Sequence, residues 1–211
     1  RRIEKQVYTG STDSWTLAAS QRFIYDGWNL IAVLDATDGN AVVKTYTWGL
    51  DLSQSAQGAG GVGGLLAVAE HNSIGSETHY ATYDANGNIS EYLDQTGAIA
   101  AHYEYSPFGR TTVATGAKSA DFNHRFSTKL FDSETELHYY GYRYYSSGIG
   151  RWINRDPIGE RDGANIYQMV QNNSLNLIDL LGQSVALSYI VCSPWIPTLE
   201  TAWNSTDETR D

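Results

Sequence analysis

The feature that most constrains the fold of this chain is an internal repeat of tyrosine, aspartate and glycine. Residues 23–39 read FIYDGWNLIAVLDATDG and residues 81–97 read ATYDANGNISEYLDQTG, and in both a Tyr-Asp pair is followed by a Gly 13 residues after the Asp. An aromatic-x-aromatic pair follows each segment, and the spacing from Tyr83 to Tyr105 is 22 residues. A repeat of this length is one supersecondary unit that cannot bury its own apolar face, so neighbouring units must stack.

Each repeat predicts a strand, a turn, a second strand and a second turn. Asn86-Gly87 is a strong signal for a type I′ hairpin turn, and residues 94–97 (DQTG) predict a polar turn. Residues 88–93 (NISEYL) and 98–105 (AIAAHYEY) alternate loosely between apolar and polar side chains, as half-buried strands do. We expect the tyrosines to pack across neighbouring strands. An aromatic stripe that binds sugars is the functional alternative.

Outside the repeat, the chain contains a glycine cluster and several less regular segments. Residues 53–78 interrupt the period, and their Gly cluster lacks the GxxxxGK[ST] pattern of a phosphate-binding loop. We expect a loop there, followed by a short apolar strand at 63–70. Residues 111–123 predict another loop, whereas 124–152 predict a hairpin at 132–136 and then a Tyr-rich strand.

The composition supports β-structure and limits the classes of function. The 211 residues include 15 Tyr, 6 Trp and 20 Gly, which favours strands separated by turns, and 41% are hydrophobic, enough to bury a core. The net charge of −10 and the lack of a Lys/Arg run argue against nucleic-acid binding. Cys192, the single cysteine, leaves no disulfide framework, and the five histidines lack metal-ligand spacing, so we expect no metal or cofactor.

The sequence also predicts neither a membrane span nor a signal peptide. The longest mainly apolar run, residues 58–70, is too short and too Gly-rich to cross a membrane as a helix. The first ten residues, RRIEKQVYTG, lack the apolar region of a signal peptide. They look like an entry into the middle of a pattern, so we expect a fragment of a longer protein.

Several motifs resemble the Rhs family of proteins. Residues 83–97 (YDANGNISEYLDQTG) and 103–110 (YEYSPFGR) look like its YD repeats. Residues 129–159, which include a Tyr-rich strand, Gly-Arg-Trp and Arg-Asp-Pro-x-Gly, resemble the Rhs repeat-associated core domain, as do residues 165–182 with Asn-x-Tyr and a final Asp-x-x-Gly. The resemblance runs from about residue 20 to residue 183, and its motifs follow the family's order.

The resemblance implies a mostly β fold made of stacked YD-repeat hairpins. In this family, which includes polymorphic toxins, the C subunits of insecticidal Tc toxins and animal teneurins, such repeats spiral into a hollow β-shell, and in the bacterial toxins the shell encloses a C-terminal toxin. The chain would then comprise a shell fragment (1–123), an inward-turning core or plug with short helical or irregular pieces (124–183), and a tail of unknown role that is a candidate cargo stub (184–211). In many bacterial members the core is an aspartyl autoprotease that cuts just after itself.

The resemblance places the catalytic pair at Asp156, in RDPIG, and Asp179, in NLIDLLG. An aspartic protease needs two carboxyls close enough to share a proton, one acting as base toward water and the other as acid. The two residues are 23 positions apart, so the chain must fold back to join them. We expect Arg155 to hold one carboxylate ionised by charge pairing, with Asp162 as the alternative second acid.

The same residues allow a purely structural interpretation. An aspartate before proline, as at Asp156, commonly opens a turn, and Asp179 can cap one. The segment departs from the family's usual Asp-Pro-x-Gly-Leu ending, because Leu180 replaces the proline and Gln183 replaces the final leucine. By alignment, a self-cleaving chain is cut at Gln183–Ser184, and the sequence leaves open whether this chain is cut, cut slowly or inactive.

Two functions therefore stand side by side. The first is the C-terminal part of an Rhs/YD-repeat shell that encapsulates a C-terminal toxin and releases it by aspartyl autoproteolysis; its partners are the rest of the shell and the enclosed segment. The second is a non-catalytic structural or surface-interaction module, adhesin-like, with a cell-surface glycan or the secretion machinery as partner. Both predict a secreted or cell-surface protein.

Overall fold

The structure, a computed structural model, describes residues 1–183 and the backbone of residues 185–187. The fold is mostly β, as the sequence predicts: the described strands form antiparallel sheets of nine, four and two strands. None of the described helices is long and apolar enough to cross a membrane.

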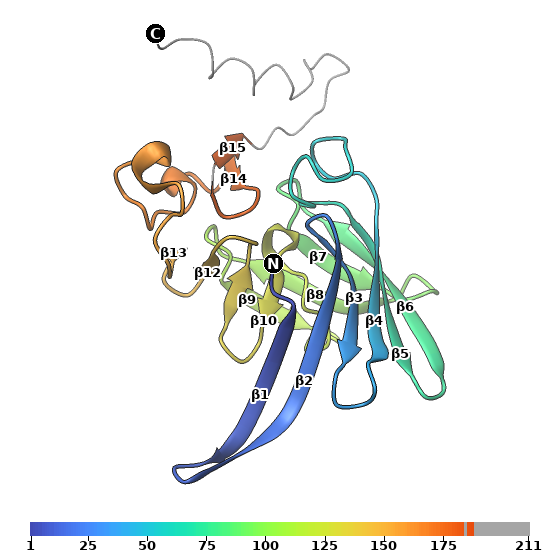
Figure 1. Cartoon of the computed structure of the whole chain (residues 1–211). Helices are drawn as coiled ribbons and strands as arrows, with labels where there is room; N and C mark the ends of the chain where they lie inside the picture. The colour runs from blue at the N-terminus through green and yellow to red at the C-terminus, as the bar shows by residue number, and fades with distance from the viewer. Residues whose placement is uncertain (184, 188–211) are drawn as a thin grey trace.

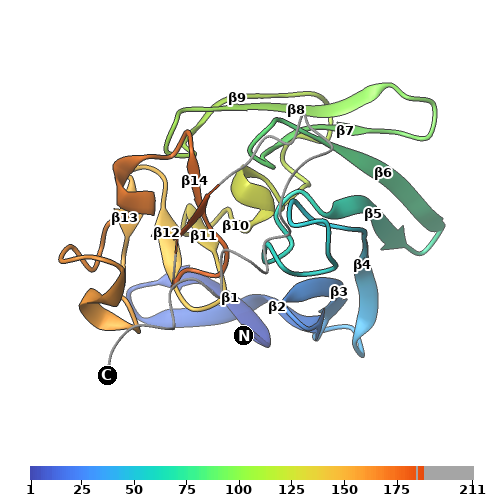
Figure 2. The same cartoon turned by 90° about the horizontal axis from the view of Figure 1, so that it is seen from above.

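The nine-stranded sheet is a meander in which every strand pairs with its neighbours in sequence. Figure 2 shows this sheet bent around the later part of the chain, with β1–β3 on one side and β7–β9 on the opposite side. A hairpin formed by β1 and β2 projects beyond the other strands (Figure 1). The strands are β1 (Glu4–Ser11), β2 (Ser14–Asp26), β3 (Asn29–Asp35), β4 (Ala41–Trp48), β5 (Leu65–Asn72), β6 (Gly75–Tyr83), β7 (Ile89–Leu93), β8 (Ile99–Tyr105) and β9 (Thr111–Thr115).

The later part of the chain forms two smaller sheets and three short 3₁₀ helices. The four-stranded sheet contains β10 (Leu130–Asp132), β11 (Leu137–Tyr139), β12 (Tyr144–Ser146) and β13 (Arg151–Trp152), and the two-stranded sheet pairs β14 (Leu177–Asp179) with β15 (Val185–Leu187). The 3₁₀ helices are η1 (Phe126–Thr128), η2 (Gly159–Asp162) and η3 (Val170–Asn172). The three 3₁₀ helices are the short helical pieces that the sequence predicts after the repeats.

The turn at Asn86-Gly87 joins two strands as predicted, but the type I′ prediction is wrong. Gly87 has a φ of +74°, whereas Asn86 is not in the positive-φ region that a type I′ turn also requires there. The Gly87 amide donates to the Asp84 carbonyl at 3.1 Å, and the Asp84 amide donates to the Asn88 carbonyl at 3.0 Å. This is a type I turn followed by a glycine in the left-handed region, which needs only one such residue.

The aspartate of the Tyr-Asp motif selects this turn. Asp84 Oδ1 accepts hydrogen bonds from the amides of Asn86 and Asn88, both at 2.9 Å. Asp94 Oδ1 accepts in the same way from Thr96 at 2.8 Å and Ala98 at 3.0 Å. A carboxylate that accepts the otherwise free amides of the turn favours the longer, five-residue connection between the two strands. The two-residue loop of a type I′ hairpin would not use these hydrogen bonds.

Other local predictions are mostly confirmed. The apolar strand expected at 63–70 is β5, and the hairpin expected at 132–136 joins β10 to β11. The loop predicted over 111–123 is wrong in its first part, because Thr111–Thr115 form β9 against β8. The sequence TTVAT lacks a clear apolar alternation because this strand is mostly exposed.

Tyrosines from neighbouring strands fill the concave face of the sheet. Tyr92 is fully buried and stacks on Phe122 with 3.9 Å between ring centroids. Its hydroxyl donates to the His124 carbonyl at 2.9 Å, and that of Tyr103 donates to the Ser119 carbonyl at 2.7 Å. These contacts confirm the packing role predicted for the repeat tyrosines, because each ring supplies buried area and each hydroxyl finds a partner.

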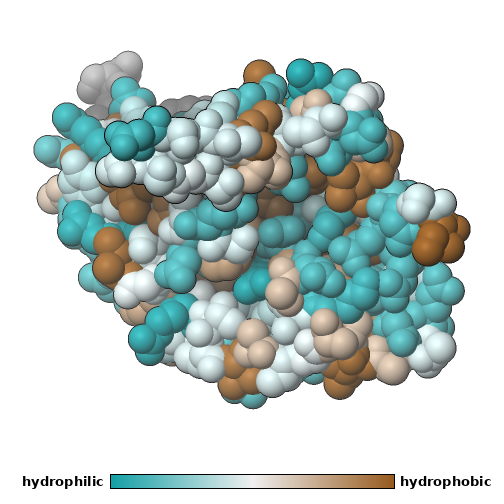
Figure 3. Space-filling model, turned by 90° about the horizontal axis from the view of Figure 1, so that it is seen from below, coloured by the Kyte–Doolittle hydropathy of each residue, from teal (hydrophilic) through white to brown (hydrophobic). Residues whose placement is uncertain are grey.

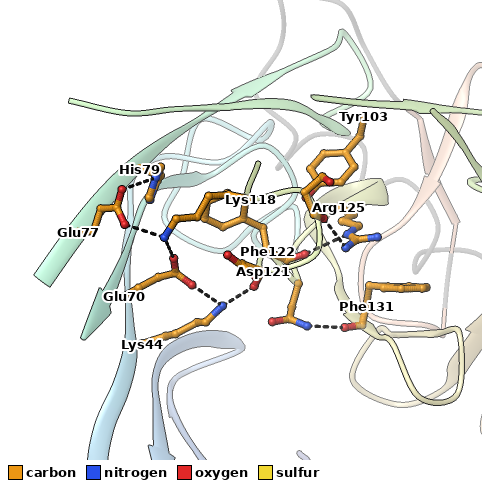
Figure 4. A network of polar contacts seen from close by, with 12 residues as sticks. Lys44, Glu70, Glu77, His79, Tyr103, Lys118, Asp121, Phe122, Arg125 and Phe131 are labelled. Atoms are coloured by element: carbon orange, nitrogen blue, oxygen red, sulfur yellow. Dashed lines mark hydrogen bonds and ion pairs between the residues drawn. The ribbon is translucent and has the colours of Figure 1, made fainter. Parts of the chain in front are cut away.

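A loop between β9 and β10 is fastened to the same face by charged side chains, as Figure 4 shows. Lys118 Nζ lies 2.9 Å from Glu70 and 2.6 Å from Glu77, so it joins the loop to β5 and β6. Lys44 on β4 pairs with Glu70 at 2.9 Å. Arg125 donates to two carbonyls within the loop. The loop therefore forms a second layer inside the curved sheet.

The opposite side of the molecule from Figure 2 is seen in Figure 3. Its surface is largely hydrophilic, and the hydrophobic side chains occur in separate groups. Exposed apolar residues scattered singly are normal for a protein surface. This view thus gives no support to a broad apolar binding face on that side.

Candidate functional site

The two aspartates singled out in the sequence lie in the region after the nine-stranded sheet, and one arginine joins them. Asp156 opens a turn after β13, Asp179 ends β14, and Arg143 directly precedes β12. All three are buried, with exposed fractions of 6%, 1% and 2% respectively. Buried charges are tolerated when they are paired and hydrogen-bonded, which is the arrangement here.

Arg143 contacts both carboxyls through separate nitrogens of its guanidinium. Its Nη1 lies 2.8 Å from Asp156 Oδ2, and its Nη2 lies 3.3 Å from Asp179 Oδ2. The guanidinium also stacks over the Trp152 ring, with Cζ 4.2 Å from the ring centroid. The planar fork of an arginine suits this task because its donors point in fixed directions. The chain thus folds back as required, and residues 23 positions apart meet at one cation.

Asp156 also has the turn-opening role that its place before a proline suggests. Its Oδ1 accepts the Ile158 amide at 2.9 Å, and its carbonyl accepts the Gly159 amide at 3.1 Å. The Asp156 amide donates to Ile166 at 3.1 Å. The other oxygen of this carboxyl, Oδ2, faces Arg143.

Asp179 caps the turn that follows β14. Its Oδ1 accepts the amides of Leu181 at 3.2 Å, Gly182 at 2.6 Å and Gln183 at 3.2 Å. Burial raises the pKa of Asp179 to about 6, and the Gly182 hydrogen bond and the Arg143 guanidinium offset only part of this rise. A carboxyl with such a pKa can hold or release a proton near neutral pH.

The carbonyls of the same segment are held as firmly as its amides. The Leu180 carbonyl accepts from Lys129 Nζ at 2.6 Å, and the Leu181 carbonyl accepts from the Tyr142 amide at 3.0 Å. The Gly182 carbonyl accepts from Arg143 Nε at 2.5 Å. The backbone from residue 180 to the amide of residue 183 is therefore fixed on both sides, immediately before the bond singled out in the sequence.

The structure corrects one predicted role and adds two residues. Arg143, not Arg155, pairs with the carboxyls; Arg155 lies exposed on the surface. Arg143 and Lys129 were missed because a lone cation in a Tyr-rich stretch is typical of a solvated position, and their burial is the signal that finds them. Asp162 ends η2, but its side chain lies outside the described residues, as does Ser184.

Metal binding finds no support in the part of the chain that the structure describes. No group of three His, Cys, Asp or Glu side chains there could hold a metal ion. Two of the histidines, His124 and His138, are buried in contact with aromatic rings, and burial lowers the pKa of each to about 3. Cys192 lies outside the described residues.

Comparison with known proteins finds toxins among the relatives of this chain. No protein-family model matches the chain. Toxin subunit YenC1 of Yersinia entomophaga is 37% identical over 106 residues, which cover 49% of this chain and 11% of that protein. Double-stranded DNA deaminase toxin A of Burkholderia cenocepacia is 29% identical over 191 residues, 85% of this chain and 13% of that protein. The chain thus spans about a tenth of the length of these relatives.

Solved structures show the same relationship. The TcdB2–TccC3 crystal structure is similar with a TM-score of 0.62 and 28% identity, over 86% of this chain and 8% of that one. The Photorhabdus luminescens Tc holotoxin pore carrying a TccC3 mutation is similar with a TM-score of 0.64 and 25% identity, over 94% of this chain and 9% of that one. The chain is therefore related to Tc toxin subunits and Rhs-type toxins.

Proposed function

We propose that this chain is the closing part of a YD-repeat shell that encapsulates a C-terminal toxin, and that it cuts itself at Gln183–Ser184. The observation that carries the proposal is the meeting of Asp156 and Asp179 at Arg143, directly beside the fixed segment that leads to this bond. Two buried carboxyls held by one guanidinium beside an immobilised backbone support an aspartyl mechanism in which one carboxyl acts as base and the other as acid.

The two carboxyls have environments that suit different roles. Asp156 makes the shorter contact to Arg143, 2.8 Å, and we assign it the role of base. Asp179 has a raised pKa and a looser contact of 3.3 Å, which suits the acid. Its Oδ2 carries the transferable proton, because Oδ1 accepts three amides.

The reaction is hydrolysis with water as the only co-reactant. Asp156 takes a proton from water while the water oxygen bonds to the Gln183 carbonyl carbon. Asp179 gives its proton to the Ser184 nitrogen as the peptide bond breaks. The products are a carboxyl group at Gln183 and a new amino terminus at Ser184, and a proton returns to Asp179 when the pair resets.

The relatives support a role in toxin delivery. Those compared above are a toxin subunit and a deaminase toxin, and one solved relative is TcdB2–TccC3 without its hypervariable C-terminal region. A variable region after a shared shell is what a carrier of different toxins requires. For this chain we infer the rest of the shell and an enclosed C-terminal segment as partners, and secretion or display at the cell surface as its location.

The test is to produce the protein at its full natural length and sequence the amino termini of its fragments. We expect a fragment that begins at Ser184, and we expect Asp156→Asn and Asp179→Asn to leave the chain whole while circular dichroism remains that of the wild type. Asp162→Asn serves as the matched variant, because Asp162 is the alternative acid. The proposal is ruled out if the wild-type protein stays intact. It is also ruled out if Asp156→Asn and Asp179→Asn are both still cleaved.

A non-catalytic structural or surface-interaction module is the second candidate, and one observation favours it. Both aspartates also satisfy the free amides of turns, so their presence can be explained by structure alone. In that case the full-length protein stays uncut. Binding to a glycan array that is lost on changing an exposed tyrosine, Tyr8 or Tyr80, gives this candidate a partner.

A further inference from the structure

Lys129 is a buried cation whose ammonium group bonds to two backbone carbonyls. Its exposed fraction is 6%, and Nζ donates to the Gly60 carbonyl at 2.8 Å and to the Leu180 carbonyl at 2.6 Å. The Tyr140 ring lies against it, with the ring centroid 5.4 Å from Nζ. A buried ammonium is costly, and an apolar side chain would fill the space as well. The position of Lys129 therefore calls for an explanation beyond packing.

The first carbonyl belongs to the glycine-rich loop of residues 51–64, to which the sequence assigns no role. Asp51 is buried and organises this loop, since its Oδ2 accepts the amides of Ala59 at 2.7 Å and Gly61 at 3.1 Å. Gly60, between them, has a φ of +60°. A side chain at Gly60 would collide with the Leu180 carbonyl oxygen, so a glycine is needed for the loop to approach that segment.

The second carbonyl belongs to the segment that ends at the proposed cut. Leu180 follows Asp179 and lies three residues before Gln183. Lys129 thus ties this segment to the glycine-rich loop, in addition to the contact that Arg143 makes with Gly182. Removing this tie would free the Leu180 carbonyl and let the segment shift relative to Asp156.

We propose that Lys129, seated on the glycine-rich loop of residues 51–64, is a positioning residue that fixes residues 180–183 for self-cleavage. The inference rests on the proposed function and extends it, because it assigns a role to the loop and to a cation outside the aspartate–arginine cluster. The physical basis is orientation: a small displacement of the reacting groups lowers the rate steeply.

The experiment compares Lys129→Met with a matched control, Lys118→Met, in the full-length protein. Lys118 also makes two polar contacts, but it lies on the loop of Figure 4 and bonds to Glu70 and Glu77. Loss of one charge-assisted hydrogen bond predicts cleavage slower by at least about tenfold in Lys129→Met. Lys118→Met is expected to cut at the wild-type rate.

Two further measurements separate positioning from a general loss of stability. Hydrogen exchange at the amides of residues 181–183 is expected to quicken in Lys129→Met while exchange in β4–β8 stays unchanged. The alkaline-side limb of the pH–rate profile, which reports the acid Asp179, is expected to move to higher pH, because the Lys129 ammonium, together with Arg143, lowers the pKa of Asp179. Lys118→Met should change neither quantity.

The outcomes separate this inference from the proposed function. A wild type that does not cut overturns the proposed function, and the tie made by Lys129 is then judged by exchange at residues 181–183 alone. The wild type can instead cut itself while Lys129→Met cuts as fast and shows equally slow hydrogen exchange at these amides. That result overturns the inference and leaves the proposed function intact. Uniformly faster exchange throughout the variant also overturns it, since that shows a stabilising residue and not a positioning one.

Discussion

The amide of Gln183 donates a hydrogen bond to the carboxyl of Asp179 at 3.2 Å. The residue before the proposed cut is therefore bound to one of the two acids proposed to make that cut. The same oxygen accepts two further amides, so Asp179 shapes the segment and also takes part in the chemistry proposed for it. These two roles can be separated by substitution.

Asp179→Asn is expected to keep the turn and lose self-cleavage. An asparagine oxygen accepts amides as a carboxylate does, so hydrogen exchange at residues 181–183 should stay near the wild-type rate. Asp179→Ala removes the acceptor as well, and we expect it to lower the free energy of unfolding by about 2–4 kcal/mol in urea titrations. Equal exchange rates in the two variants would refute the capping role.

The raised pKa of Asp179 makes stability depend on pH. The folded pKa of about 6 lies above the ordinary value of 3.8, so the stabilisation from protonating this carboxyl is full below about pH 4 and is lost as the pH rises through 6. The size of the effect is about 3 kcal/mol. The measurement is the difference in unfolding free energy between wild type and Asp179→Asn from pH 4 to pH 8; it should fall between pH 4 and 6 and then level off.

Arg143→Met is expected to destabilise the protein by about 3–5 kcal/mol, because two buried carboxyls lose their shared cation. Arg143→Lys keeps the charge but cannot reach both carboxyls through a planar fork, so we expect an intermediate loss. Arg155→Met provides the control, since Arg155 is exposed. Thermal unfolding of the three variants should rank them in that order, and a neutral Arg143→Met would show that the cluster does not hold this region together.

Two turn glycines should respond differently to alanine. Gly87 has a φ of +74°, and a Cβ there would lie 2.7 Å from Val62 Cγ1 and 3.1 Å from the Gly63 amide nitrogen. Gly97 has a φ of +86°, but nothing lies within 4 Å of its Cβ position. Gly97→Ala should cost about 1 kcal/mol for backbone strain alone, and Gly87→Ala about 2 kcal/mol or more. Equal costs in denaturant titrations would contradict the close approach of the loop at Val62.

Glu70→Gln tests the charged contacts of Figure 4. Burial raises the pKa of Glu70, but hydrogen bonds from Lys118 and Lys44 outweigh it and hold the pKa below its ordinary value. We expect a loss of about 1 kcal/mol at low salt, shrinking as sodium chloride screens the cluster. Glu136→Gln, at the exposed hairpin between β10 and β11, is the control and should leave the unfolding midpoint unchanged.

The sequence predicts the curved sheet well because its signals are local and periodic. Tyr92 and Tyr103 fall at positions where the repeat demands inward-facing rings, and both are buried. The position of the turn at Gly87 is predicted correctly, but its type is not. The turn type depends on the amides that donate hydrogen bonds to the Asp84 carboxylate. Strand β9 is not predicted from the sequence, because TTVAT is mostly exposed and shows no alternation of apolar and polar residues.

The site is harder to predict because it joins residues that are distant in sequence. Arg155 is adjacent to Asp156, yet neighbours in an extended chain point to opposite sides, and Arg155 faces solvent. Arg143 reaches both carboxyls only because the residue before β12, the turn after β13 and the end of β14 come together in three dimensions. The aspartates themselves were found through motifs of a related family, which supply the information that local patterns lack.

The order of the sheet has a consequence for how the protein is made. Each of the nine strands pairs only with the strands before and after it, so this sheet has a low contact order and can grow hairpin by hairpin as the ribosome delivers the chain. The cluster at Arg143 is different, since it needs Asp179, which is synthesised 36 residues later. The nine-stranded sheet can thus be complete before the aspartates meet, so the order of synthesis would place the proposed cleavage after this sheet has formed.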